Sequence, residues 1–316
     1  MKEIRGQRLV DRYREFYHIP ADCVVTEDMI LKHWELERRL TEELLASSPE
    51  SRWEVFDRCY GALYGELEWL NRMIDTDPSS KTTSYYPEWE RIIGQPPMKI
   101  YEVGSGKARL ILYLAERGFE CRATEITRER GEKWAATHPN LTWGISDGVH
   151  LEKFEAADSY DVVISGQVVE HMHPDDVLDH FRGVRAILAR GGRYIFTVPH
   201  PSVGPTDVSR VFGYDKPMGM HLKEYTYDEI ARLLRNAGFD RVCATLTVPR
   251  TLGRLVGRDF RPMPSSGYLT YLRFLEKLIM AMPTQELRRK AAKAAKVIRF
   301  HPTTMLIAHK GSGLSS

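Results

Sequence analysis

A glycine-rich turn between a short apolar run and a helix-like run constrains the fold of this chain more than any other feature. Residues 100–109 read I-Y-E-V-G-S-G-K-A-R, so apolar residues lead into Glu102, Gly104 and Gly106. Glycine has no side chain and tolerates positive φ, so the backbone at such a turn can approach a ligand closely. The helix start that follows offers unpaired N–H groups to an anionic group. The turn favours a nucleotide-like cofactor, although G-x-G also occurs at plain strand–helix corners.

The chain after this turn alternates between strand and helix. Strands are predicted at residues 99–103, 119–126, 141–145, 160–165, 192–198 and 241–248. Helices are predicted between them at residues 108–117, 128–137, 175–188 and 227–237. Such alternation produces a parallel sheet that is covered on both faces, and right-handed crossovers make it doubly wound. A last strand at residues 303–309 is expected to pair beside the strand at 241–248.

The changes in pattern divide the chain into four expected parts. Residues 1–95 form a helical N-terminal extension, with one helix capped by Thr26 and a long second helix opened by a capping box at 47–50. Residues 96–248 form the α/β core. The remaining parts are a helical insertion at residues 249–302, with helices at 267–282 and 284–300, and a last core strand with a tail at residues 303–316.

Composition excludes several classes of protein. Hydrophobic residues make up 42% and charged residues 28% of the 316 residues, as in ordinary globular proteins, and a net charge of +2 gives no reason to expect nucleic acid. The four cysteines lie far apart without a C-x-x-C pair, which argues against a zinc site or a disulfide framework. The first residues lack the apolar core of a signal peptide, and no run is long enough to span a bilayer. We therefore expect a cytoplasmic protein.

The motifs around the turn distinguish two classes of cofactor. A nicotinamide fingerprint reads G-x-G-x-x-G, and Arg109 stands where its third glycine belongs. The turn, Glu125 after the second strand and Asp147 after the third resemble the class I S-adenosylmethionine-dependent methyltransferases. The resemblance spans residues 98–240. It continues in D-V-V-I-S-G-Q-V-V-E-H at 161–171 and in L-A-R-G-G at 188–192, where arginine replaces the usual proline.

This resemblance implies a seven-stranded, Rossmann-like methyltransferase sheet and S-adenosyl-L-methionine as the cofactor. Glu125 is then expected to bind both ribose hydroxyls, Asp147 to meet the adenine amino group, and Gln167 to border the methyl group. The N-terminal helices and the insertion are expected to cover the site. The residues expected at the cofactor are Glu102, Gly104, Ser105, Gly106, Glu125, Ile126, Asp147, Gly148, Gly166 and Gln167.

The pair Glu170–His171 carries the expected chemistry. His171 is the first candidate for a general base, because an ordinary imidazole pKa of about 6.5 suits proton transfer near neutrality. The pair also resembles the quinone-precursor O-methyltransferases, in which an E-x-x-E-H set can hold a divalent metal. Gln167 occupies the first position of that set here, so no metal site is predicted.

His200, after the fifth strand, is a further catalytic candidate. Acceptor contacts are expected at Tyr85, Tyr86, His200, His221 and Tyr225. For each of these side chains, and for His171, plain packing is the alternative.

Methyl transfer to a small molecule is the function that these motifs favour. Oxygen is the preferred acceptor atom, in natural-product, sugar or glycan tailoring, with nitrogen and sulfur as alternatives. A nicotinamide oxidoreductase or a cofactor-binding scaffold without turnover is the contrasting reading. The basic run at residues 288–299 is read as a solvated helix face, with an anionic acceptor, a membrane surface or nucleic acid as alternatives. The oligomeric state stays open.

Overall fold

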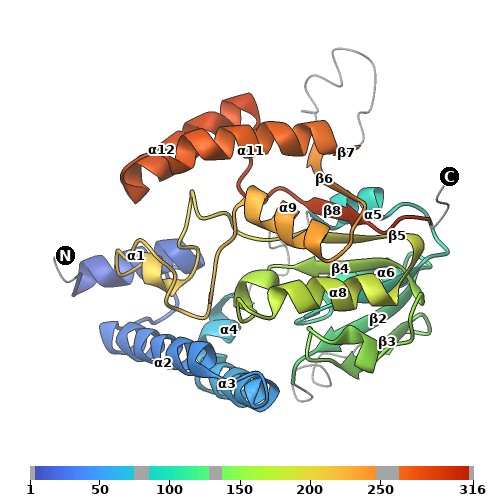
Figure 1. Ribbon diagram of the computed structural model, residues 1–316. Helices are drawn as coiled ribbons and strands as arrows, with labels where there is room; N and C mark the ends of the chain where they lie inside the picture. The colour runs from blue at the N-terminus through green and yellow to red at the C-terminus, as the bar shows by residue number, and fades with distance from the viewer. Residues whose placement is uncertain (1–3, 75–84, 128–136, 247–262, 313–316) are drawn as a thin grey trace.

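The structure, a computed structural model, describes residues 4–74, 85–127, 137–246 and 263–312. A single eight-stranded sheet lies at its centre. Helices cover both faces of this sheet, and the helices of the first quarter of the chain form a separate group to one side (Figure 1).

The sheet has the order β3-β2-β1-β4-β5-β8-β6-β7. The strands are β1 (Lys99–Glu102), β2 (Glu120–Glu125), β3 (Leu141–Ile145), β4 (Tyr160–Gly166), β5 (Leu188–Thr197), β6 (Arg241–Leu246), β7 (Met263–Ser265) and β8 (Leu306–His309). Strands β1 to β5 pair in parallel, and β8 lies antiparallel between β5 and β6. The predicted doubly wound sheet is confirmed, with the short β7 as an addition to the seven predicted strands. The strand order reverses between β1 and β4, and such a reversal opens a ligand crevice at the carboxyl ends.

Alternating side chains of the strands fill two cores. On one face, Tyr101 and Phe196 pack against α8 (Val177–Ile187), α9 (Tyr227–Asn236) and α11 (Ser266–Met280). On the other face, neighbouring strand residues pack against α5 (Tyr86–Ile93) and α6 (Arg109–Ala115). The period of two along each strand sends successive residues to opposite faces, which explains why the strands read as continuous apolar runs.

The N-terminal helices form a third core with the loop that follows β5. The helices are α1 (Gln7–Tyr17), α2 (Glu27–Ala46), α3 (Arg52–Glu66) and α4 (Glu68–Ile74). The predicted cap is confirmed, because Thr26 Oγ1 accepts a hydrogen bond of 3.3 Å from the N–H of Met29. Val208, Met220 and Leu222 of the loop pack into the same core. This packing joins the N-terminal helices to the carboxyl edge of the sheet.

Several predicted boundaries are wrong. The single long helix is two helices that break at Leu67, and its capping box is absent, because Ser47 Oγ instead donates to the Leu44 carbonyl at the end of α2. Helices α1 and α5 were not predicted. Strand β5 begins at Leu188 rather than at residue 192. The predicted helix at 128–137 and the end of the strand at 241–248 fall largely or partly outside the described residues, and the four-part division stays a prediction.

The C-terminal helices follow the predicted order. Helix α12 (Gln285–Ala295) and the 3-10 turn η5 (Lys296–Ile298) succeed α11. Two cations of the basic run are engaged internally, since Arg288 donates to the Met282 carbonyl and Arg289 to the Gly204 carbonyl, both at 2.9 Å. None of the helices in the described part of the chain has both the length and the apolar character that crossing a membrane requires.

Candidate functional site

A cavity of about 1750 Å³ opens at the carboxyl ends of the central strands, between the sheet and the N-terminal helices. All ten residues expected at the cofactor line it, as do Tyr85, Tyr86 and His221 from the expected acceptor contacts. His171 also lines it. Pockets for drug-sized ligands measure about 300–1000 Å³, so this cavity has room for a cofactor and a second molecule.

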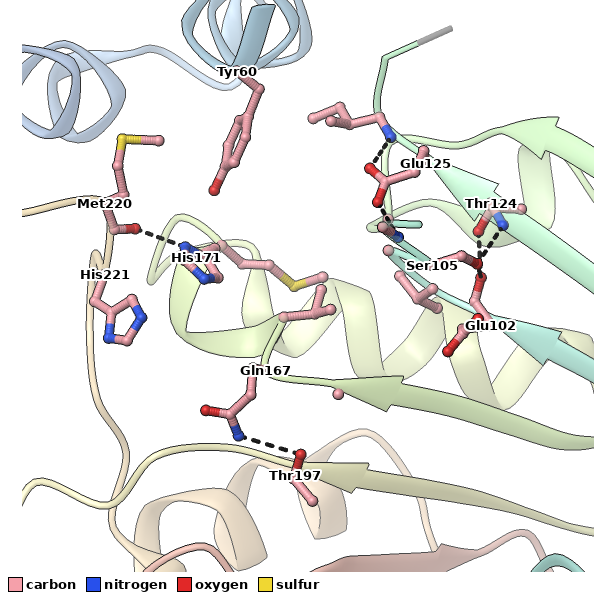
Figure 2. Close-up of a pocket in the computed structure, with 18 of the residues that line it drawn as sticks. Tyr60, Glu102, Ser105, Thr124, Glu125, Gln167, His171, Thr197, Met220 and His221 are labelled. Carbon is pink, nitrogen blue, oxygen red and sulfur yellow. Dashed lines mark hydrogen bonds between the residues drawn. The ribbon is translucent and has the colours of Figure 1, made fainter. Parts of the chain in front are cut away.

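The glycine turn forms one wall of the cavity (Figure 2). Gly104 has φ of +64°, and a Cβ there would lie 2.9 Å from Val168 Cγ2, so a side chain at this position would be strained and crowded. The N–H of Ser105 donates to the Thr124 carbonyl at 2.8 Å, and the N–H of Thr124 donates to Ser105 Oγ at 3.0 Å. These reciprocal bonds fix the turn to β2 and expose its backbone to the cavity.

Glu125, the last residue of β2, holds the turn from the other side. Its Oε1 accepts a hydrogen bond of 2.5 Å from the N–H of Gly106, and its Oε2 accepts one of 3.3 Å from the N–H of Ile126. Burial raises the pKa of this carboxyl, and the two backbone N–H groups oppose that rise. Each carboxylate oxygen can accept a second hydrogen bond, so the side chain can also bind a pair of hydroxyls.

Glu102 is a buried carboxyl at the end of β1. Its Oε2 has no hydrogen-bond partner within the described chain. Burial raises the pKa of Glu102 to about 8; a bond from Ser105 lowers it and the charge of Glu125 raises it further. The group is therefore mostly protonated at pH 7, and a cationic ligand would supply the partner that it lacks.

The loop after β3 forms another wall of the cavity. Asp147 Oδ1 accepts from the N–H groups of Val149 and His150, both at 2.8 Å, which closes a tight turn. Burial lowers the pKa of His180 to about 4, so this imidazole is neutral at pH 7. Its Nδ1 lies 2.5 Å from the Gly148 carbonyl, to which it donates. His180 thereby positions the loop from behind.

Gln167, after β4, has a strained backbone. Its φ of 57° lies in the left-handed region, which is uncommon outside glycine. The N–H of Gln167 donates to the Thr197 carbonyl at 3.0 Å, and its Nε2 donates to Thr197 Oγ1 at 3.2 Å. Strain of this kind persists where neighbouring contacts impose it, as they do at many ligand sites.

Two imidazoles face each other at the far end of the cavity (Figure 2). The ring centroids of His171 and His221 lie 4.7 Å apart, with the rings nearly perpendicular. His171 Nδ1 lies 2.9 Å from the Met220 carbonyl, which can only accept, so this nitrogen carries the proton. His221 Nδ1 lies 3.3 Å from Thr206 Oγ1 and 3.5 Å from Glu224 Oε1. Burial would lower the pKa of His221, but Glu224 and the nearby charges of Glu170 and Asp207 outweigh it and raise the pKa.

The carboxylate of Glu170 lies close to the imidazoles of His171 and His221. Its side chain is fully buried, and neither carboxylate oxygen has a hydrogen-bond partner among the residues that the structure describes. One oxygen of Glu170 and one nitrogen of each imidazole lie within 4.8 Å of one another. Burial raises the pKa of Glu170 to about 7 against the opposing charge of His221. His171 and His221 of the cavity lining therefore form a cluster of three titratable groups with the buried Glu170, which is not part of that lining.

A family model described as "Methyltransferase domain" matches residues 70–244, more than half of the 316 residues. This chain belongs to the methyltransferase domain family. The match covers the whole glycine turn, Glu125, Gln167 and both imidazoles. A search of the curated proteins finds no match.

The methyltransferase domain is similar to several solved structures. One is the 1,6-didemethyltoxoflavin-N1-methyltransferase of Burkholderia thailandensis, at 16% identity over 84% of this chain and 91% of that chain, with a TM-score of 0.49. Another is a methyltransferase from Archaeoglobus fulgidus, at 16% identity over 73% and 91% of the two chains, with a TM-score of 0.44. A third is a methyltransferase from Mesorhizobium loti, at 20% identity over 72% and 97%, with a TM-score of 0.43.

Two residues predicted at the site, His200 and Tyr225, lie outside the cavity. His200 is 1% exposed and lies outside the cavity lining, with Nδ1 2.8 Å from Ser202 Oγ and Nε2 2.8 Å from Glu276 Oε2. Tyr225 is also buried away from the cavity, beneath Lys223. His200 does follow β5, as predicted, but α11 packs over the loop and turns the imidazole into an interior contact.

We predict that Glu276→Ala lowers the free energy of unfolding by about 3–5 kcal/mol, since each buried donor left without its acceptor costs about 1–3 kcal/mol. The variant would leave His200 and the N–H groups of Tyr227 and Asp228, which donate to Glu276 at 2.6 and 3.1 Å, without their acceptor. Urea denaturation measures the loss, with Glu286→Ala on exposed α12 as a control that should unfold like the wild type. Lower turnover in a Glu276 variant of unchanged stability would restore a catalytic role for His200.

Residues of the N-terminal helices line the cavity without having been predicted there. Tyr60 of α3 projects toward the imidazole pair (Figure 2). Arg52 of α3 forms an ion pair with Asp176, at the start of α8. Glu37 of α2 also reaches the lining. The spacing of Tyr60 matches an ordinary apolar helix stripe, so no signal in the sequence distinguishes it from a core residue.

Proposed function

We propose that this chain transfers a methyl group from S-adenosyl-L-methionine to a small-molecule acceptor and releases S-adenosyl-L-homocysteine. One observation carries the proposal: in a methyltransferase domain, the Glu125-bound glycine turn and the imidazole pair line the same cavity. Glu125 would bind the ribose, Asp147 the adenine and Glu102 the amino group of the cofactor. Gln167 and Gly166 would border its methyl group.

We assign the acceptor atom to oxygen. In the reaction, the acceptor oxygen forms a bond to the methyl carbon while the sulfonium–carbon bond breaks, and the hydroxyl proton leaves to a base. Since Nδ1 of His171 donates to the Met220 carbonyl, Nε2 of this imidazole carries the basic lone pair. Alignment supplies most of the rate, because the cofactor is already activated. Tyr85, Tyr86 and His221 would contact the acceptor, and nitrogen or sulfur acceptors are the alternative.

A labelled-cofactor screen tests this function. The purified chain is incubated with methyl-labelled S-adenosyl-L-methionine and metabolite pools, and mass spectrometry identifies the labelled product. We expect a hydroxylated small molecule that gains one methyl group. Calorimetric binding of NAD(H) without binding of S-adenosyl-L-homocysteine would rule the proposal out.

We predict that cofactor binding releases a proton near neutral pH. The pKa of Glu102 lies at about 8 because the carboxyl is buried, so it must ionise to pair with the amino group of the cofactor. Below this pKa the affinity should rise with pH, by up to about tenfold per unit. Calorimetry in two buffers of different ionisation enthalpy measures the released proton. Glu102→Gln should abolish the release, and wild-type heats that do not depend on the buffer would contradict the assignment.

A further inference from the structure

We propose that Glu170, His171 and His221 bind a divalent transition-metal ion at the end of the cavity where the methyl group is transferred. The three side chains come from two separate segments, the turn after β4 and the loop that follows β5. Their ligand atoms all lie within 4.8 Å of one another, close enough for small side-chain movements to bring them onto one ion. Binding of the metal stands independently of the proposed function, and its catalytic use rests on that function.

The buried Glu170 is the observation that first points to a cation. Neither of its carboxylate oxygens has a hydrogen-bond partner in the described part of the chain, although the side chain is fully buried. Burying an ionised carboxylate without a partner costs several kcal/mol, so such groups normally pair with a cation or coordinate a metal. A cation bound beside Glu170 would supply the partner that its oxygens lack among the described residues.

The two imidazoles are held as metal ligands usually are. His171 Nδ1 donates to the Met220 carbonyl at 2.9 Å, and His221 Nδ1 lies beside Thr206 Oγ1 and Glu224 Oε1. Metal-binding histidines almost always donate their other ring N–H to a carbonyl or carboxylate, which fixes the tautomer so that Nε2 is the nitrogen able to coordinate. The Met220 carbonyl is itself fixed, because the N–H of Met220 donates to Thr41 Oγ1 of α2 at 2.7 Å.

The donor set selects the class of ion. Two imidazoles and one carboxylate suit Zn²⁺, Mn²⁺, Fe²⁺ or Co²⁺, whereas Mg²⁺ and Ca²⁺ prefer all-oxygen sites. A His₂Glu set is also the ligand set of catalytic zinc sites that keep an open position. His171 and His221 line the cavity, so the open positions of the ion would face the acceptor. With the ion bound, the Nε2 lone pair of His171 is a ligand and no longer a base. A hydroxyl bound to the ion would then lose its proton to solvent near neutral pH, because a metal lowers the pKa of bound oxygen.

The prediction of no metal rests on the local motif at residues 167–171 alone and does not include the loop after β5. Gln167 occupies one position of the local motif, and its amide is engaged with Thr197. The third ligand comes instead from His221, which the fold brings back over the turn. A protonated His221 that merely neutralises Glu170 is the competing explanation, and a metal titration separates the two.

The experiment uses the purified chain after treatment with a chelator. Co²⁺ and Zn²⁺ are titrated separately, with visible absorption of bound Co²⁺ and calorimetry as readouts. We expect one ion per chain and a rise in Kd of at least tenfold in Glu170→Gln and in His221→Asn, since even a single lost outer-shell partner costs 10–100-fold. His173→Asn removes an imidazole two residues from His171 that is not a member of the cluster, and it should keep wild-type affinity. Binding of S-adenosyl-L-homocysteine checks that each variant is folded.

Each outcome bears on one of the two proposals. Failure of the wild type to bind either Co²⁺ or Zn²⁺, or binding that persists with wild-type affinity in both variants, would overturn the metal site. Metal-free protein that transfers methyl groups at the full rate would overturn the catalytic role of the ion and leave the methyltransferase function standing. A chain that binds one ion but transfers no methyl group to any acceptor would support the site and overturn the proposed function.

Discussion

Glu125→Ala is expected to raise the Kd for S-adenosyl-L-homocysteine at least 100-fold. Glu125 has two tasks: its oxygens accept from the N–H groups of Gly106 and Ile126, and they would accept from both ribose hydroxyls. Hydrogen bonds to a charged group contribute about 1.5–3 kcal/mol each, so the loss of two ribose bonds alone predicts this change. Isothermal titration calorimetry measures the affinity directly.

Two further variants separate binding from folding. Glu125→Gln keeps the shape and one acceptor oxygen, so its affinity should fall between those of the wild type and the alanine variant. Glu120→Ala, at the opposite end of β2, removes an exposed carboxylate that pairs only with Lys99 in the described chain and should bind like the wild type. Unchanged affinity in Glu125→Ala would remove the ribose assignment.

The cofactor half of the site was predictable because its signals are local. A strand end, a glycine turn and a helix start lie within ten residues, and the parallel sheet brings the corresponding ends of β2, β3 and β4 to the same edge. Glu125, Asp147 and Gln167 could therefore be placed together without any knowledge of side-chain packing. The apolar runs predicted the strands, and their parallel arrangement predicted the edge of the sheet at which their carboxyl ends meet.

The residues of the acceptor half of the site could not be predicted, because their positions depend on which long-range contacts form. His200 and His221 both lie on the connection between β5 and α9, and sequence alone treats them alike. Helix α11 buries His200 against Glu276, whereas the packing of Met220 on α2 turns His221 into the cavity. Tyr60 enters from α3, a helix outside the sheet. Each placement follows from how three or four elements pack, which no periodicity encodes.

Helices α1 and α5 were missed for a related reason. Short helices are marginal on their own, and tertiary packing of an apolar face supplies most of their stability. Leu9, Val10 and Tyr13 of α1 are buried against the N-terminal core, and Trp89 and Ile93 of α5 against the sheet. The apolar residues of these two segments are few and are separated by charges, so their pattern indicates a helix only once the partner surface is known.

His171→Ala is expected to lower turnover about 100-fold or more, while the affinity for S-adenosyl-L-homocysteine changes little. General-base catalysis contributes about 10²–10⁴ in rate, and loss of a metal ligand would remove the activation of the same hydroxyl. His171 lies at the far end of the cavity from Glu125, so the ribose and adenine contacts should survive. Single-turnover transfer from labelled cofactor measures the chemical step, and calorimetry measures the binding.

The variant also distinguishes a base from a metal ligand. If His171 is the base, the alanine variant keeps its metal content and loses the acid limb of the pH–rate profile, because the group whose deprotonation gives that limb is gone. If His171 is a ligand, the variant loses metal and turnover together, and Glu170→Gln should show the same joint loss. His18→Asn serves as the control, since this exposed histidine ends α1 with φ of 53°, which asparagine tolerates. Wild-type turnover in His171→Ala would exclude both roles and leave the imidazole as a packing residue beside Tyr60.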